Sequence, residues 1–192
     1  MKNRTIIQDF LLLSERPNGR KWEEHPEGIL VSGMLTRFGE TNCNGFRFEP
    51  GSYDKCIAEY FEANGLNVPL TVQHNDNDIR HIVGRVTKME KKGDGVYMEA
   101  VILAVHPEFE TVKSLIDGGV LQGFSNYGWA VDCSFTEDGD LAVHEFTLLS
   151  ASLVTTPADV SGKLEMRNTR FEGFAPEKEE EKDKPKDIYS IF

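Results

Sequence analysis

Hydrophobic and polar residues alternate through much of the middle of the chain, a pattern typical of half-buried β-strands. We expect strands in segments that are rich in apolar and β-branched residues and bounded by turn residues: 28–35, 67–74, 82–89, 96–104, 123–134 and 141–149. A further short strand over 151–156 ends at Pro157. Pro69 lacks the N–H that a ladder needs, so we expect the start of its strand near a sheet edge.

Two segments carry apolar residues at helical spacing instead. We expect a helix over 54–64 and another over 107–117, the second one ended by Gly118-Gly119. Turn residues join strands 82–89 and 96–104, and strands 123–134 and 141–149, into hairpins. The pattern predicts an α+β domain with a curled antiparallel β-sheet or barrel as its core and a few helices.

The two ends of the chain differ from this middle. Residues 1–27 contain Pro17, Asn18-Gly19 and Pro26, and we expect a loose N-terminal lead-in. Between Glu172 and Asp187 there are seven acidic residues and four lysines with almost nothing apolar. Such a composition cannot offset its ordering entropy, so we expect one globular domain over 28–170 and a charged, disordered tail over 171–192.

Composition narrows the function classes. The 192 residues carry 21 basic and 32 acidic side chains, a net charge of −11, which argues against nucleic-acid and membrane partners. Cys43, Cys56 and Cys133 are widely spaced, which fits neither a disulfide framework nor a zinc site, and favours a reducing cytoplasm. The apolar run 10–13 is too short for a signal peptide or a membrane span.

Three segments contain residues suited to catalysis. His74 ends an apolar strand in Gln73-His74-Asn75-Asp76, and Ser125 lies between Gly123 and Gly128 just after a predicted helix. Glycines there allow the close backbone approach that a substrate and an oxyanion pocket need. The third segment runs from 148 to 159 and contains several hydroxyl side chains. The serine segment is not a Gly-x-Ser-x-Gly elbow, because its second glycine follows the serine by three residues.

A second chemistry is open in the same region. His74, Asp76, Asp78 and His81 form a cluster rich in nitrogen and oxygen that could hold a divalent metal. The spacing matches no metalloenzyme motif, and loops rich in Asn and Asp are usually turns. We therefore expect no metal and no cofactor, and keep a metal-dependent hydrolase as a minor alternative.

Five segments in series resemble the prohead (capsid-maturation) serine proteases of tailed bacteriophages, whose fold is akin to that of the herpesvirus assemblins. The similarity covers roughly residues 28 to 165. The matching segments are the first strand 28–35, Phe48-Glu49-Pro50-Gly51-Ser52-Tyr53, Val72-Gln73-His74-Asn75-Asp76 with Ile82-Val83-Gly84, 117–125, and Ser152-Leu153-Val154-Thr155-Thr156-Pro157-Ala158.

This resemblance implies roles for individual residues. Ser125 corresponds to the nucleophile and His74 to the general base, while the family's third catalytic position, usually an acid, is Ser150 here. A serine hydroxyl can accept the histidine N–H bond but brings no charge, so a glutamate at this position is expected to raise activity. His144 and Glu145 are alternative orienting residues, and Arg85 is a candidate auxiliary cation.

The implied function is that of a serine endopeptidase working through an acyl-enzyme. It would act inside the procapsid, in the host cytoplasm, on scaffold segments, on the major capsid protein and on itself, with a homo-oligomer as the expected assembly. The alternative, favoured by the missing acid at Ser150, is a catalytically inactive scaffold or interaction module of the same fold.

Overall fold

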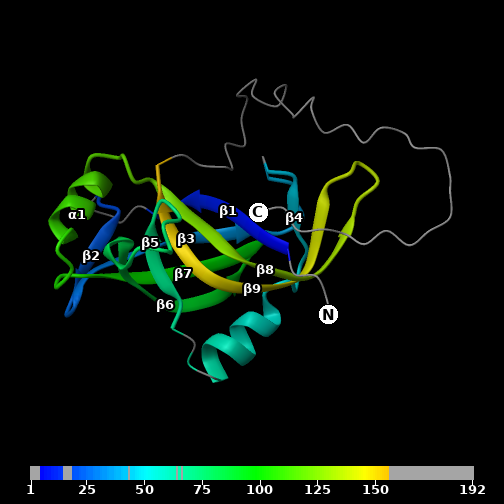
Figure 1. Cartoon of the computed structure of the whole chain (residues 1–192), viewed down its shortest axis with the longest axis horizontal. Coiled ribbons are helices and arrows are strands. Elements are labelled where there is room, and N and C mark those ends of the chain that lie inside the picture. The colour runs from blue at the N-terminus through cyan, green and yellow to red at the C-terminus, as the bar shows by residue number, and fades with distance from the viewer. Residues whose placement is uncertain (1–4, 15–18, 43, 64, 66, 156–192) are drawn as a thin grey trace.

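The protein is built around one nine-stranded sheet with three short helical segments (Figure 1). The computed structural model describes residues 5–14, 19–42, 44–63, 65 and 67–155. The strands are β1 (Thr5–Leu12), β2 (Trp22–His25), β3 (Gly28–Arg37), β4 (Phe46–Phe48), β5 (Pro69–Val72), β6 (Ile82–Lys92), β7 (Gly95–Leu103), β8 (Gly123–Phe135) and β9 (Leu141–Val154). The helices are the π-helix η1 (Cys56–Ala63), the 3₁₀-helix η2 (Ile79–His81) and the α-helix α1 (Phe109–Asp117).

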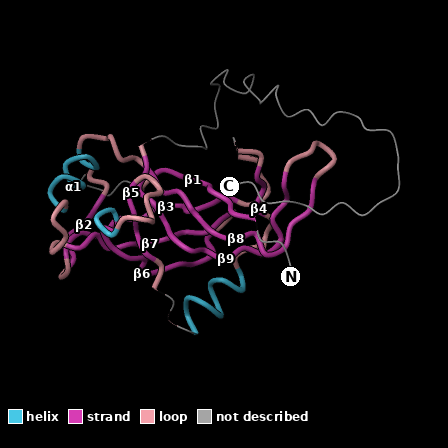
Figure 2. The backbone as a smooth tube through the Cα atoms, viewed as in Figure 1, coloured by secondary structure: helices cyan, strands magenta, loops and turns pink. Residues whose placement is uncertain are grey.

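The sheet is open and curled, with the strand order β1-β8-β9-β5-β6-β7-β3-β2 and with β4 against the start of β9. Just after β1, Leu13 bridges Gly33 of β3, so the curl brings distant parts of the sheet together (Figure 2). The expected sheet was antiparallel, whereas β4 and β5 both run parallel to β9. These two strands reach β9 through long connections instead of hairpins, which permits the parallel direction.

The N-terminal lead-in differs from the expectation of a loose segment, because it contributes two strands. All of β1 pairs with β8 in an antiparallel ladder, from Thr5 opposite Ala130 to Leu12 opposite Gly123. Strand β2 pairs with β3, and its Trp22 is buried and donates its indole N–H to Asp117 Oδ1 at 2.6 Å. Of the turn residues that suggested looseness, Gly19 lies between β1 and β2, and Pro26 lies between β2 and β3.

Two strand predictions need correction. Strand β5 lies inside the sheet, between β9 and β6, although Pro69 suggested an edge. Pro69 is the first residue of β5, where the missing N–H is tolerated. The segments expected as two strands, 141–149 and 151–156, form one continuous strand, β9, with a β-bulge between them. At the bulge, Tyr127 lies opposite Ser150 and Gly128 lies opposite Leu148, so Leu149 has no residue opposite it on β8.

Both predicted helices form, as η1 and α1, and the hairpins β6–β7 and β8–β9 form as expected. The core beside η1 contains three aromatic rings, with Phe146 meeting Phe48 edge-on at 5.3 Å between ring centroids and Tyr53 at 5.0 Å. No helix among the described residues is long and apolar enough to cross a membrane. The expected tail, 171–192, lies outside the described residues.

Candidate active site

Ser125 lies on β8, in the interior of the sheet. It is directly opposite Phe10 of β1 on one side and Ser152 of β9 on the other. Directly opposed residues of an antiparallel pair project to the same face, so Ser125 and Ser152 share one face of the sheet. The serine is only 3% exposed, which places any reaction at its hydroxyl in a largely desolvated environment.

The same face continues from β9 onto β5. Ser152 lies opposite Thr71, and their hydroxyl oxygens are 2.5 Å apart in a buried hydrogen bond. Because neighbouring strands are about 4.8 Å apart, Ser125 and Thr71 are separated by roughly 10 Å across β9. The strand that carries Ser125 is therefore two positions away from the strand that leads to His74.

The chain turns sharply where β5 ends. Gln73 and His74 have φ angles of 56° and 55°, and both are non-glycine residues in the left-handed region. Such a conformation costs on the order of 1–3 kcal/mol per residue, and it persists only where the surroundings hold it. Two contacts with β9 do so: the backbone N–H of Gln73 donates to the Leu153 carbonyl at 2.9 Å, and the Ser150 hydroxyl donates to Asp76 Oδ2 at 2.7 Å.

These contacts fold the His74 loop back along β9. Ser150 precedes Ser152 by two residues, so both side chains lie on the face that carries Ser125. Since Asp76 reaches Ser150, residues 73–76 turn back over this face instead of continuing away from the sheet. The structure thus brings the loop that carries His74 to the face on which Ser125 lies, and it shows no hydrogen bond between His74 and Ser125 within its described residues. Catalytic hydrogen bonds are often long or absent without substrate.

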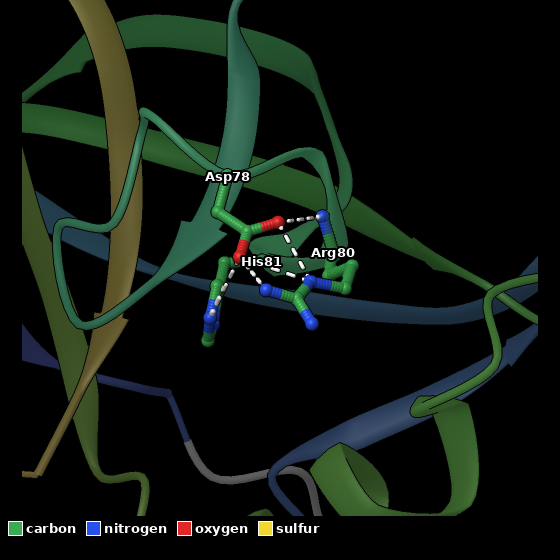
Figure 3. A network of polar contacts seen from close by, with 3 residues as sticks. All are labelled: Asp78, Arg80 and His81. Atoms are coloured by element: carbon green, nitrogen blue, oxygen red, sulfur yellow. Dashed lines mark hydrogen bonds and ion pairs between the residues drawn. The ribbon is translucent and has the colours of Figure 1, made fainter.

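The far end of the loop is held by Asp78, as Figure 3 shows. Its carboxylate caps η2 by accepting the backbone N–H of Arg80 at 3.0 Å, and it also binds the Arg80 guanidinium at 2.6 Å. His81 Nε2 lies 3.9 Å from the same carboxylate. The hydrogen bonds from Arg80 lower the pKa of Asp78 to about 2, so this cap stays charged at any ordinary pH.

His74 is half-buried, and its Nδ1 atom is sealed from solvent with no hydrogen-bond partner. Asp76 Oδ1 is buried in the same way. Burial lowers the pKa of His74 below 6.5, and the nearby Asp76 charge opposes this effect in part. The imidazole is therefore neutral at neutral pH, which is the state that a general base requires.

Ser150, expected beside the imidazole, is 2% exposed, and its hydroxyl donates to Asp76. The sequence analysis assigns Asp76 no catalytic role: it includes this residue only in a possible metal cluster and in the segment that resembles the family. The signal that points to its role is its place two residues after His74, but only the fold shows which strand it faces.

The alternative orienting residues have partners elsewhere. His144 Nε2 and Ser134 Oγ are 2.7 Å apart on the exposed part of the β8–β9 hairpin, and Glu145 Oε1 is 3.1 Å from Lys55 Nζ. At about 3.3 Å per residue, positions 144 and 145 lie roughly 16–20 Å along β9 from Ser150. Neither residue therefore adjoins the His74 loop.

The remaining candidates also have other partners. Arg85 of β6 forms an ion pair with Glu27, a residue of the turn between β2 and β3, with 2.6 Å between Nη2 and Oε2. Within the described residues, no group of three or more histidine, cysteine or acidic side chains is arranged to hold a metal ion. Asp76 faces Ser150 and Asp78 faces Arg80, so the four residues of the expected metal cluster do not converge.

Two glycines near the candidate residues, Gly84 and Gly128, are needed for the packing of neighbouring strands. A Cβ on Gly84 would lie 1.8 Å from the Val101 carbonyl oxygen, and one on Gly128 would lie 2.2 Å from that of Thr147. These close approaches are made by neighbouring strands and not by space left for a substrate. The N–H groups of β8 around Ser125 are ladder groups with β1 or β9, so donors for an oxyanion have to come from outside this strand.

No family model and no curated protein matches the chain. Among solved structures, the fold is similar to that of the bacteriophage T4 capsid assembly protease gp21, with a TM-score of 0.63 and 17% sequence identity. The alignment covers 80% of this chain and 99% of that one. The chain therefore has the fold of a phage capsid protease.

Proposed function

We propose that this protein is a prohead serine endopeptidase, which cleaves capsid and scaffold proteins during the assembly of a tailed phage. Two independent observations support the proposal. Five sequence segments resemble that family, and the fold is similar to that of a phage capsid assembly protease. The procapsid within the host cytoplasm is then the place of action, and a fold akin to that of the herpesvirus proteases is part of the same proposal.

The observation that carries the catalytic assignment is the path of the His74 loop. The loop leaves β5 through two residues in the left-handed conformation and is hydrogen-bonded to Ser150 of β9. Strand β9 pairs with β8, the strand that carries Ser125. A buried serine and a neutral histidine on one face of a sheet are the minimum for nucleophilic peptide hydrolysis.

In the proposed reaction, Ser125 Oγ attacks the scissile carbonyl carbon while His74 Nε2 takes the hydroxyl proton. Collapse of the tetrahedral intermediate breaks the C–N bond, and the protonated imidazole gives its proton to the leaving amine. Water then attacks the acyl-enzyme, again with His74 as base, and releases the second product and free Ser125. Burial of His74 serves this cycle because it keeps the resting imidazole unprotonated.

A second candidate is a module that has kept the fold and lost catalysis. The absence of a Ser125–His74 hydrogen bond within the described residues favours it, as does a hydroxyl at the position where the family usually has an acid. Labelling with a fluorophosphonate, which modifies activated serines, separates the two candidates.

The test uses the wild-type chain, Ser125→Ala and Ser134→Ala. Ser134 is a matched control, since it lies on the same strand and also has a histidine partner, His144, at 2.7 Å. We expect stoichiometric labelling of wild type and Ser134→Ala and none of Ser125→Ala. Incubation with the major capsid protein of the same phage should show cleavage by the same two proteins. Absence of labelling in folded wild type would favour the inactive module.

A further inference from the structure

Two buried polar atoms of opposite character lie in the His74 loop without partners. One is Nδ1 of His74, which is a donor when it carries the ring proton, and the other is Oδ1 of Asp76, which is an acceptor. Buried polar atoms are nearly always hydrogen-bonded, and each one left without a partner destabilises the folded protein. Such a pair, two residues apart, is most simply explained as a bond that forms when the site is occupied.

The other oxygen of the same carboxylate is already held. Ser150 donates to Asp76 Oδ2 at 2.7 Å from β9, and Ser150 is 2% exposed. A hydrogen bond to an ionised acceptor is among the stronger ones in proteins and fixes the plane of the carboxylate. With Oδ2 fixed by Ser150, Oδ1 is left as the oxygen available to the imidazole.

The charge pattern is consistent with this arrangement. Among the described residues, Asp76 is the charged group that acts on the His74 imidazole, and it favours the protonated form. The next acid along the loop, Asp78, is occupied by Arg80 and His81. Across the sheet face, the residues of β8 and β9 that share this region are Ser125, Tyr127, Ser150 and Ser152, none of which is an acidic or basic residue.

We infer that Asp76 is the residue that positions the catalytic histidine, by accepting the Nδ1–H bond of His74 on Oδ1, and that Ser150 holds the Asp76 carboxylate in place through Oδ2. This inference rests on the proposed function for its catalytic meaning. A proton on Nδ1 leaves the lone pair on Nε2, where a base facing Ser125 needs it. The charge missing from β9 at position 150 is thereby supplied from the histidine's own loop.

The test follows the His74 ring directly by NMR titration in the full chain with Ser125→Ala, which removes self-cleavage. Of the five histidines, His74 is identified by the signals that disappear in His74→Asn, since asparagine tolerates the left-handed backbone. We expect Asp76→Asn to move the His74 midpoint to lower pH by about one unit, a tenfold change in protonation, because an attractive charge is lost.

Asp78→Asn is the matched control, an equal loss of charge two residues further along the loop. We expect it to leave the His74 midpoint in place. Ser150→Thr keeps the hydroxyl and should preserve the His74 midpoint, whereas Ser150→Ala should move it part of the way. Should Asp76→Asn fail to fold, Asp76→Glu keeps the charge, and we expect the His74 midpoint to stay within about 0.3 pH units.

An unchanged His74 midpoint in folded Asp76→Asn would overturn the inference, as would an equal shift in Asp78→Asn. The NMR result needs no enzymatic activity, so it is separate from the proposed function. If wild type is not labelled by the fluorophosphonate but the His74 midpoint still moves, the positioning role stands and the protease assignment fails. If labelling occurs, Asp76→Asn should slow it by up to about 10⁴-fold, the loss seen when such an acid is removed elsewhere.

Discussion

The Ser150 hydroxyl donates a hydrogen bond to Asp76 Oδ2 at 2.7 Å and so joins two segments that are 74 residues apart in the chain. One segment is the loop that carries His74, and the other is the strand paired with Ser125. This bond assigns Ser150 a different partner from the one that the family resemblance implied, and it changes what substitutions at this position should do.

Replacing Ser125 by alanine should abolish proteolysis and leave the fold intact. Loss of a catalytic serine elsewhere costs on the order of 10⁴–10⁶ in rate, whereas removing one hydroxyl from a buried strand position removes little packing. Cleavage of the capsid protein and the thermal midpoint are the measurements. Ser134→Ala should match wild type in both. Cleavage by Ser125→Ala above about a tenth of the wild-type rate would contradict the nucleophile assignment.

Replacing Ser150 by alanine should weaken both stability and activity, because it leaves Asp76 Oδ2 without its donor. Hydrogen bonds to charged groups contribute about 1.5–3 kcal/mol, so we expect a loss of that order in the free energy of unfolding, measured with urea. Ser150→Thr should recover most of it. A loss in Ser150→Thr as large as that in Ser150→Ala would show that packing and not the hydroxyl matters.

Replacing Ser150 by glutamate should lower activity, which is the opposite of the expectation from sequence alone. In the structure the new carboxylate would face Asp76, and two like charges in a partly buried site repel each other. The measurement is the fluorophosphonate labelling rate, with Ser150→Gln as the uncharged control of similar size. Faster labelling in Ser150→Glu than in wild type would return Ser150 to the position beside the imidazole.

The rate of fluorophosphonate labelling should fall at low pH because His74 becomes protonated. Burial lowers the pKa of His74 below 6.5 in the folded protein, so the labelling rate should fall only below pH 6.5. Stability follows with the same sign: below pH 6.5 the unfolded chain binds a proton that the folded chain resists, so the free energy of unfolding decreases as pH falls, until the folded pKa is passed. His74→Asn should lose this part of the pH dependence in urea unfolding between pH 8 and pH 5, a range chosen around the ordinary pKa of about 6.5.

Gly84 should tolerate no side chain. A Cβ at this position would meet the Val101 carbonyl oxygen at 1.8 Å, so Gly84→Ala has to displace β6 from β7 and with it the end of the His74 loop. We expect a large loss of soluble folded protein. Gly118→Ala is the control, because its nearest atom, the Ser114 carbonyl oxygen, is 3.2 Å away and its φ of −77° is ordinary. Similar thermal midpoints for the two variants would contradict the account.

The sequence by itself determined most strands and the two longer helices of this protein, and its resemblance to a family pointed to the candidate nucleophile and base. Alternation at period two and helical spacing depend on neighbouring residues, so the hairpins β6–β7 and β8–β9 and the helices η1 and α1 were predictable. The two strands of the lead-in were not, because nothing local distinguishes a strand that is stabilised only by its partner, as β1 is by β8.

The tertiary structure decided the parts of the site that depend on long-range pairing. The parallel register of β5 with β9 sets where the His74 loop begins, and the left-handed turn at Gln73 and His74 directs Asp76 onto Ser150. His144 and Glu145 were the alternative partners by sequence, yet they lie several residues away from Ser150 along the same strand, beside Ser134 and Lys55. A hydrogen bond needs two groups within about 3 Å, and for residues 74 positions apart only the fold provides that distance.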